Sequence, residues 1–302
     1  MSQMPAISLA AVPGRRAQTV ELAVEAEKRG FVGIFGPSMG DAVSLMLSIA
    51  HATNEIRFGT SVQPLYFRHP IDMAGTAAYI HEISGGRFYM GIGVSHGPVH
   101  DRFGLEPGKP LADTRDYVGQ MRAAEKAVGE LPPIVLATLR DKMVALSVEV
   151  GDGAVWANAS LNAMPESLAK IPTEVRDGDF YIGNMIPTVI DDDKKAAGDR
   201  NRKTLAGYVQ LPNYRNYWKQ AGYVEEMEAV ESAMADKDFQ RIPSVLSDRW
   251  LSSCTLYGPA NEVREGVEAW YDAGVKCPIL VPSSINGGQM VAIAEMFDTF
   301  SN

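Results

Sequence analysis

The sequence predicts a (β/α)8 barrel, an α/β fold in which eight parallel strands alternate with helices. First, short runs rich in β-branched and aromatic residues alternate with longer segments of helical periodicity along the 302 residues. Second, glycine and proline separate these segments at regular intervals. Third, an α/β barrel commonly occupies about 250 residues as one domain. We therefore expect residues 1–302 to form a single barrel domain.

The clearest repeating unit lies between residues 56 and 94. Residues 56–62 form a β-rich run, residues 71–83 have the pattern of a helix, and the pair Gly85-Gly86 ends that helix. Residues 87–94 then form a second apolar run of strand length. A strand, a helix and a strand in this order predict one right-handed βαβ unit of a parallel sheet.

The other elements continue this alternation. Further strands are expected at 6–12, 31–35, 134–138, 154–157, 181–190 and 278–282. Further helices are expected at 15–29, 42–52, 111–129, 140–150, 163–171, 259–273 and 289–300. Asp41 is the expected N-cap of the second helix. Residues 95–110 are expected to form a long loop, which in compact domains usually indicates function.

Residues 191–250 interrupt the alternation. They are rich in charged residues and include an aromatic group: Tyr208, Tyr214, Tyr217, Trp218 and Tyr223. No flexible linker borders this segment, so we expect a helical insertion in the barrel and not a separate domain. The aromatic group is more typical of helix packing or of an interface than of a cofactor site.

Composition restricts the possible partners. The formal net charge of −9 argues against nucleic acid or an anionic membrane as the main partner. No basic segment followed by an apolar core opens the chain, and no apolar run reaches eighteen residues. Cys254 and Cys277 are the only cysteines, which is no disulfide framework. We expect a cytoplasmic protein with a small-molecule substrate.

Three familiar site patterns are incomplete. Gly91 and Gly93 follow a strand, but the third glycine of a dinucleotide-binding fingerprint would fall on His96. Residues 93–97 match the nucleophile elbow G-x-S-x-G, yet only His100 follows the serine as a possible base. His96, His100 and Asp101 lie on one short loop, which offers poor metal geometry. Hydrolase and metal chemistry are therefore disfavoured, and no metal is expected.

Two groups at strand ends remain as candidates, because the C-terminal ends of barrel strands carry the active site. His96 is interpreted as a proton donor or a ligand contact, against an ordinary role in the loop. Residues 137–142 end one strand and begin a helix. A phosphate could bind there to the free backbone N–H groups, the Thr138 hydroxyl, Arg140 and Lys142. The alternative, given equal weight from these residues alone, is that they form the ordinary start of a surface helix.

Several stretches together resemble the luciferase-like family of flavin- and deazaflavin-dependent oxidoreductases. The similar stretches are residues 59–70, 83–93, 146–155, 256–259 and 273–275. They occur in the family's order and span nearly the whole chain. The resemblance implies a barrel with the flavin or deazaflavin ring across the strand C-termini. It also implies a cis peptide bond at Ser61–Val62.

The resemblance also implies residue roles. Cofactor-binding residues would be Ser61, Val62, Gln63, Gly93, Val94, Ser95, Ala137, Thr138, Leu139, Arg140 and Trp156. Those at 137–140 would hold the phosphate, and Trp156 would meet the ring. His96 would be catalytic in proton transfer or ring polarisation, with Ser95 positioning it. The family's acid and histidine after the second strand are absent here, where residues 36–40 are Gly-Pro-Ser-Met-Gly.

The resemblance favours an oxidoreductase that uses coenzyme F420 for hydride transfer to or from a small organic substrate. The sequence at residues 91–96 and 109–111 is most similar to that of actinobacterial proteins assigned to coenzyme F420. An FMN-dependent monooxygenase on the same fold is the alternative. A barrel that binds a flavin without turnover is a third hypothesis, because the acid–histidine pair is absent. A homodimer is expected.

Overall fold

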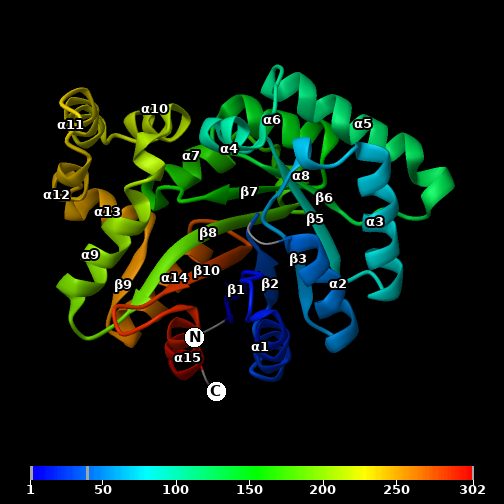
Figure 1. The fold of residues 1–302 in the computed structure, drawn as a ribbon, viewed down its shortest axis with the longest axis horizontal. Helices are drawn as coiled ribbons and strands as arrows, with labels where there is room; N and C mark the ends of the chain where they lie inside the picture. Colours follow the sequence, from blue (N-terminus) through cyan, green and yellow to red (C-terminus); the bar gives the residue numbers. More distant parts are fainter. Residues whose placement is uncertain (1–2, 39–40, 301–302) are drawn as a thin grey trace.

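The chain forms a closed parallel barrel, shown by a computed structural model that describes residues 3–38 and 41–300 (Figure 1). β10 pairs with β1 on one edge and with β8 on the other, so the eight strands close on themselves. The predicted (β/α)8 barrel is thereby confirmed. The barrel strands are β1 (Ala6–Ser8), β2 (Gly33–Gly36), β3 (Arg57–Thr60), β5 (Phe88–Gly93), β6 (Ile134–Ala137), β7 (Gly153–Ala157), β8 (Tyr181–Ile190) and β10 (Cys277–Ser283).

The third strand of the barrel is interrupted and then resumes. After β3 the peptide bond between Ser61 and Val62 is cis, as the family resemblance implied. A two-residue strand, β4 (Gln63–Pro64), follows and pairs with β5. The short helical turn η1 (Leu65–Phe67) then leads into the next helix.

The helices surround the sheet as Figure 1 shows. They are α1 (Arg16–Lys28), α2 (Ala42–Ala52), α3 (Pro70–Ile83), α5 (Pro110–Val128), α6 (Asp141–Val150), η2 (Leu161–Ala163), α7 (Met164–Leu168), α8 (Thr173–Arg176), α14 (Ala260–Asp272) and α15 (Gln289–Thr299). Asp41 caps α2 as predicted, because its side chain accepts a hydrogen bond from the Ser44 backbone nitrogen at 3.2 Å. Within the described residues, no helix is both long and apolar enough to cross a lipid bilayer.

Side chains of the strands pack in two layers. One set fills the barrel interior and includes Phe35, Val135, Val155 and Ile279. The larger set lies between the strands and the helices. Tyr181 packs against Phe35 and Tyr89 inside the barrel, with ring centroids 5.6 and 5.3 Å apart. The interior below the strand ends is therefore filled by side chains, as barrels of this size require.

The expected insertion is present and helical. Its elements are α9 (Lys194–Leu205), η3 (Tyr208–Gln210), α10 (Pro212–Gln220), α11 (Val224–Ala235), η4 (Phe239–Arg241), α12 (Ile242–Val245) and α13 (Asp248–Cys254). Figure 1 shows these helices together beyond the end of β8. The chain returns through β9 (Leu256–Gly258), a strand that the sequence pattern did not predict, and β9 pairs with the last residues of β8.

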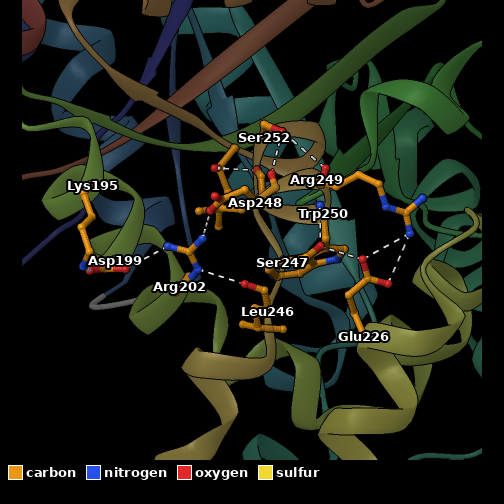
Figure 2. Close-up of polar contacts among 12 residues, drawn as sticks. Lys195, Asp199, Arg202, Glu226, Leu246, Ser247, Asp248, Arg249, Trp250 and Ser252 are labelled. Carbon is orange, nitrogen blue, oxygen red and sulfur yellow. Dashed lines mark hydrogen bonds and ion pairs between the residues drawn. The ribbon is translucent and has the colours of Figure 1, made fainter.

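Polar contacts hold the insertion helices to one another (Figure 2). Arg202 of α9 donates to the Leu246 carbonyl at 3.0 Å and to Asp199 at 2.8 Å, and it pairs with Asp248 of α13. Nearby, Glu226 of α11 accepts a 2.6 Å hydrogen bond from the Ser247 hydroxyl and pairs with Arg249. The first set joins α9 to α13, and the second joins α11 to α13.

The predicted loop at residues 95–110 contains a helix, so that expectation was wrong in part. α4 (Gly97–Phe103) carries proline in its first turn, where the missing N–H costs nothing. Gly104, with φ of 61°, ends it in the left-handed conformation. No residue of α4 is fully buried, so no apolar periodicity marked this helix in the sequence.

Candidate functional site

An apolar floor lies at the C-terminal mouth of the barrel. A Cβ placed on Gly93 would lie 2.8 Å from both the Ala137 Cβ and the Val62 Cγ2, so these three residues are in contact. Val62, Ala137, Ala157 and Val281 are partly exposed and pack on the interior cluster. We call these four residues and Gly93 the apolar floor. Gly91 has a packing role instead, because a Cβ there would overlap the Thr60 carbonyl oxygen.

Ser61 and Gln63 lie beside this floor. The Ser61 backbone nitrogen donates to the Gly36 carbonyl at 2.7 Å, while its buried hydroxyl has no hydrogen-bond partner among the described residues. Gln63 is also buried, and its side-chain amide makes a long contact of 3.4 Å with the Pro64 carbonyl. The loop after β2 begins within the described residues, but its Met39 and Gly40 lie outside them.

The predicted phosphate residues lie where β6 leads into α6. The Thr138 backbone nitrogen donates to the Val155 carbonyl at 2.8 Å, and its hydroxyl lies 3.5 Å from that oxygen. Leu139 is half-buried, and Arg140 is exposed at the start of α6. No side chain caps the first N–H groups of α6, and Arg140 forms no ion pair with any described residue. Free N–H groups and a free guanidinium are suitable for an anion.

Trp156 lies apart from these residues. Its side chain is fully buried in the outer cluster, between β7 and the helices, and its indole nitrogen has no hydrogen-bond partner in the part of the chain that the structure describes. The neighbouring Val155 belongs to the interior cluster, as expected from the alternation of side chains along a strand. Trp156 therefore has no exposed surface at the mouth in this structure.

Val94, Ser95 and His96 follow β5 directly. The Val94 carbonyl lies 2.6 Å from the His100 Nε2, and Ser95 has a positive φ of 63°. The half-buried His96 ring lies 5.7 Å from the Tyr214 ring and 6.4 Å from the Tyr208 ring, measured between centroids. Burial, with a smaller effect of His100, lowers the pKa of His96 below its ordinary value. The imidazole is thus neutral at neutral pH.

The sequence did not identify three residues that contribute to this site. Tyr208 and Tyr214, from the insertion, contact His96 and had been attributed to packing or an interface. Asn158 lies just beyond β7 with a positive φ of 57°, and its amide lies near the hydroxyls of both tyrosines. An asparagine directly after a strand was the available signal, since asparagine is enriched in the left-handed region.

The described residues contain no metal-binding group. No three or more histidine, cysteine, aspartate or glutamate side chains lie close enough together in residues 3–38 and 41–300 to hold a metal ion. The two cysteines in that part of the chain are buried and unpaired. Charged side chains at the strand ends include Arg140 after β6 and Arg200, whose guanidinium donates to the Ser283 hydroxyl at the end of β10 at 2.7 Å.

The sequence and the fold agree on one family. The model of the luciferase-like monooxygenase family matches residues 4–277. The chain belongs to this family. A relative from Mycobacterium tuberculosis, provisionally named a coenzyme F420-dependent oxidoreductase, is 26% identical over 314 residues, which cover 87% of this chain and 90% of the relative.

Solved structures share the fold. The coenzyme F420-dependent tetrahydromethanopterin reductase of Methanopyrus kandleri superposes with a TM-score of 0.77 at 16% identity, covering 97% of both chains. An F420-dependent secondary alcohol dehydrogenase, solved with an F420–acetone adduct, superposes with a TM-score of 0.74 at 16% identity and covers 100% of both chains. The FMN-bound oxygenating component of a diketocamphane monooxygenase from Pseudomonas putida superposes with a TM-score of 0.64 at 13% identity. The match covers 100% of this chain and 98% of that one.

Proposed function

We propose that this protein is a coenzyme F420-dependent oxidoreductase that transfers a hydride between the deazaflavin and a small organic substrate. The contact among Val62, Gly93 and Ala137 carries the proposal, because it forms a side-chain-poor floor across three adjacent strand ends. The mycobacterial relative and two structural neighbours bear names that specify F420. Those two neighbours also superpose better than the FMN-bound monooxygenase.

The residues present fit a flat ring that carries a phosphate-bearing chain. The apolar floor would lie under the ring, and the Ser61 hydroxyl beside it, which has no partner among the described residues, is an available polar group. The uncapped N–H groups of α6 and the exposed Arg140 guanidinium would hold the phosphate. When bound, the deazaflavin would supply the carbon that gives or receives the hydride.

His96 would move the proton that accompanies the hydride. Because its imidazole is neutral, it can accept the hydroxyl proton of an alcohol substrate during oxidation, and its protonated form can return that proton during reduction. Ser95, in its left-handed conformation, sets the direction in which the chain leaves β5 and presents His96. The tyrosine rings beside His96 would cover part of it from water.

The second candidate is an FMN-dependent monooxygenase. The FMN-bound structural neighbour has the same fold, and the floor and phosphate residues would accept the flavin ring and phosphate of FMN. This reading assigns the same residues to the cofactor. It differs in the requirement for oxygen and for a separate supply of reduced flavin.

Cofactor titrations of the purified protein test both proposals. Binding would be followed through the intrinsic fluorescence of F420 and of FMN, for the wild type, for R140Q and for the control R176Q. Arg176 lies on α8, which precedes β8 and is thus at the opposite end of the barrel. Tight binding of F420, weakened about 10-fold by R140Q alone, is expected. Preference for FMN would favour the monooxygenase, and binding of neither would refute both readings.

A further inference from the structure

Four side chains from three parts of the chain form a cluster at the barrel mouth. His96 follows β5, Asn158 follows β7, and Tyr208 and Tyr214 belong to the insertion. The Tyr208 and Tyr214 rings lie 5.2 Å apart and nearly perpendicular, and both face the His96 ring. The insertion therefore contributes directly to the surroundings of the proposed proton-transfer residue.

The Asn158 amide is a buried donor in this cluster. Asn158 is only 4% exposed, and its backbone nitrogen donates to the Met185 carbonyl at 2.9 Å. Its side-chain nitrogen has no hydrogen bond of standard geometry to any described residue, yet the amide lies near both tyrosine hydroxyls. A buried amide without a partner is costly, so the phenol oxygens are its natural acceptors.

This arrangement leaves the phenol protons available to donate to another group. A hydroxyl that accepts from an amide through its oxygen still has one O–H to donate. Tyr214 is buried, whereas Tyr208 is half-buried at the edge of the cluster next to His96. Tyr208 is therefore the member that can present its O–H to a ligand at the mouth.

Other tyrosines of the insertion have hydroxyls with an evident structural partner. The Tyr217 hydroxyl accepts a 2.9 Å hydrogen bond from the Ser160 backbone nitrogen. The Tyr223 hydroxyl accepts one of 3.3 Å from the Asn162 side chain. These bonds fasten the insertion to the segment after β7, so Tyr208 differs from both in its surroundings as well as in its exposure.

We infer that Tyr208 binds the carbonyl or hydroxyl oxygen of the substrate beside His96, and that Asn158 is the residue that positions Tyr208. This inference rests on the proposed function and narrows it to substrates that interconvert a ketone or aldehyde with an alcohol. Neutral donors suit such an oxygen, whereas a carboxylate would require a cation.

The chemistry balances with the groups named. In reduction, the reduced deazaflavin, when bound, would supply the hydride that the carbonyl carbon accepts, and the π electrons of the C=O bond would move to oxygen. His96, which is neutral at neutral pH and takes up a proton from solvent before this step, then gives that proton to the oxygen, so that ketone, hydride and proton form the alcohol. Tyr208 stays protonated throughout and stabilises the developing negative charge. Burial raises its pKa, although the Asn158 amide opposes this effect.

The test uses cyclohexanone labelled with 13C at the carbonyl as the probe, with the protein both free and loaded with F420. Wild type, Y208F, N158G and the control Y223F would be compared by the 13C shift of bound probe, by KM and kcat for its reduction, and by F420 affinity. We expect a downfield shift in wild type and Y223F. Y208F and N158G should lose the shift and raise KM about 3- to 10-fold, with F420 affinity unchanged.

Each outcome decides the question. An equal shift in Y208F and wild type, or no shift in wild type, would overturn the inference even if F420 binds well. A Tyr208-dependent shift in the free protein, without any binding of F420, would support the oxygen site and refute the proposed cofactor. N158G serves as the second variant because glycine keeps the left-handed backbone conformation at residue 158 and removes the amide donor.

Discussion

Replacement of Gly93 by alanine tests the apolar floor directly. The new Cβ would lie 2.8 Å from the Ala137 Cβ and from the Val62 Cγ2, about 1 Å inside ordinary carbon contact. The Ala137 Cβ is fixed to the backbone of β6, so the clash requires a shift of the strands or of Val62. Overpacking of this kind costs about 1–3 kcal/mol. We expect G93A to lose that much free energy of unfolding and to bind F420 about 10-fold more weakly.

Urea denaturation and the fluorescence titration measure the two effects. The matched control is G119A in the middle of α5, because Gly119 is exposed and a Cβ there would meet no atom within 4 Å. G119A should gain about 0.5–1 kcal/mol from the better helix propensity of alanine and leave F420 binding unchanged. Wild-type stability and affinity in G93A would refute the close contact of Val62, Gly93 and Ala137.

Three further predictions concern charged and titrating groups. The Glu27 carboxylate accepts hydrogen bonds of 2.7–2.9 Å from the three backbone N–H groups of residues 54–56. Burial alone would raise the pKa of Glu27, but these hydrogen bonds together outweigh burial, so the pKa is lowered. In urea denaturation at pH 7, E27A should have a free energy of unfolding about 1–3 kcal/mol below that of wild type. This difference in stability should shrink as the pH falls through the lowered pKa of Glu27, because the protonated carboxyl loses its advantage. The substitution R202A removes the half-buried side chain shown in Figure 2 and should lower the free energy of unfolding by about 1.5–3 kcal/mol in the same urea assay. The control is R115A: its ion pair with Glu149 is exposed, so the urea midpoint of unfolding should stay unchanged. Burial lowers the pKa of His96, so its contribution to stability is complete above about pH 6.5 and is lost as pH falls through the lowered pKa. H96Q should therefore show a smaller drop in Tm between pH 7 and pH 5 than wild type, and an equal drop would contradict a buried neutral imidazole.

Much of the fold could be predicted because the strands of a barrel are short apolar runs between strong turn signals. All eight barrel strands were located in this way. β9 was missed because three residues carry no periodicity, and Leu256–Gly258 is a strand only through its pairing with the end of β8. α4 was missed because Gly97 and Pro98 are typical of loops and its side chains bury too little surface to show a pattern.

The candidate site was predictable where a role depends on the position along a strand. Val62, Gly93 and Ala137 follow this rule, because the ends of neighbouring parallel strands must meet. The direction of Trp156 was not predictable, since both faces of a barrel strand are apolar and the sequence does not alternate. The contact of Tyr208 with His96 depends on the path of the insertion, for which the sequence contains no local signal.

The pairing of β8 with β9 makes the insertion a separable module of the barrel. β8 uses one edge for β10 and the other for β7 and then β9, and the Asp191 backbone nitrogen donates to the Gly258 carbonyl at 3.0 Å. The insertion thus leaves and re-enters the barrel at a single point. Its length and sequence can diverge between relatives without opening the seam between β8 and β10. Under the proposed function, a change of substrate preference would then need changes in this one segment alone, while the strand ends beneath it stay the same.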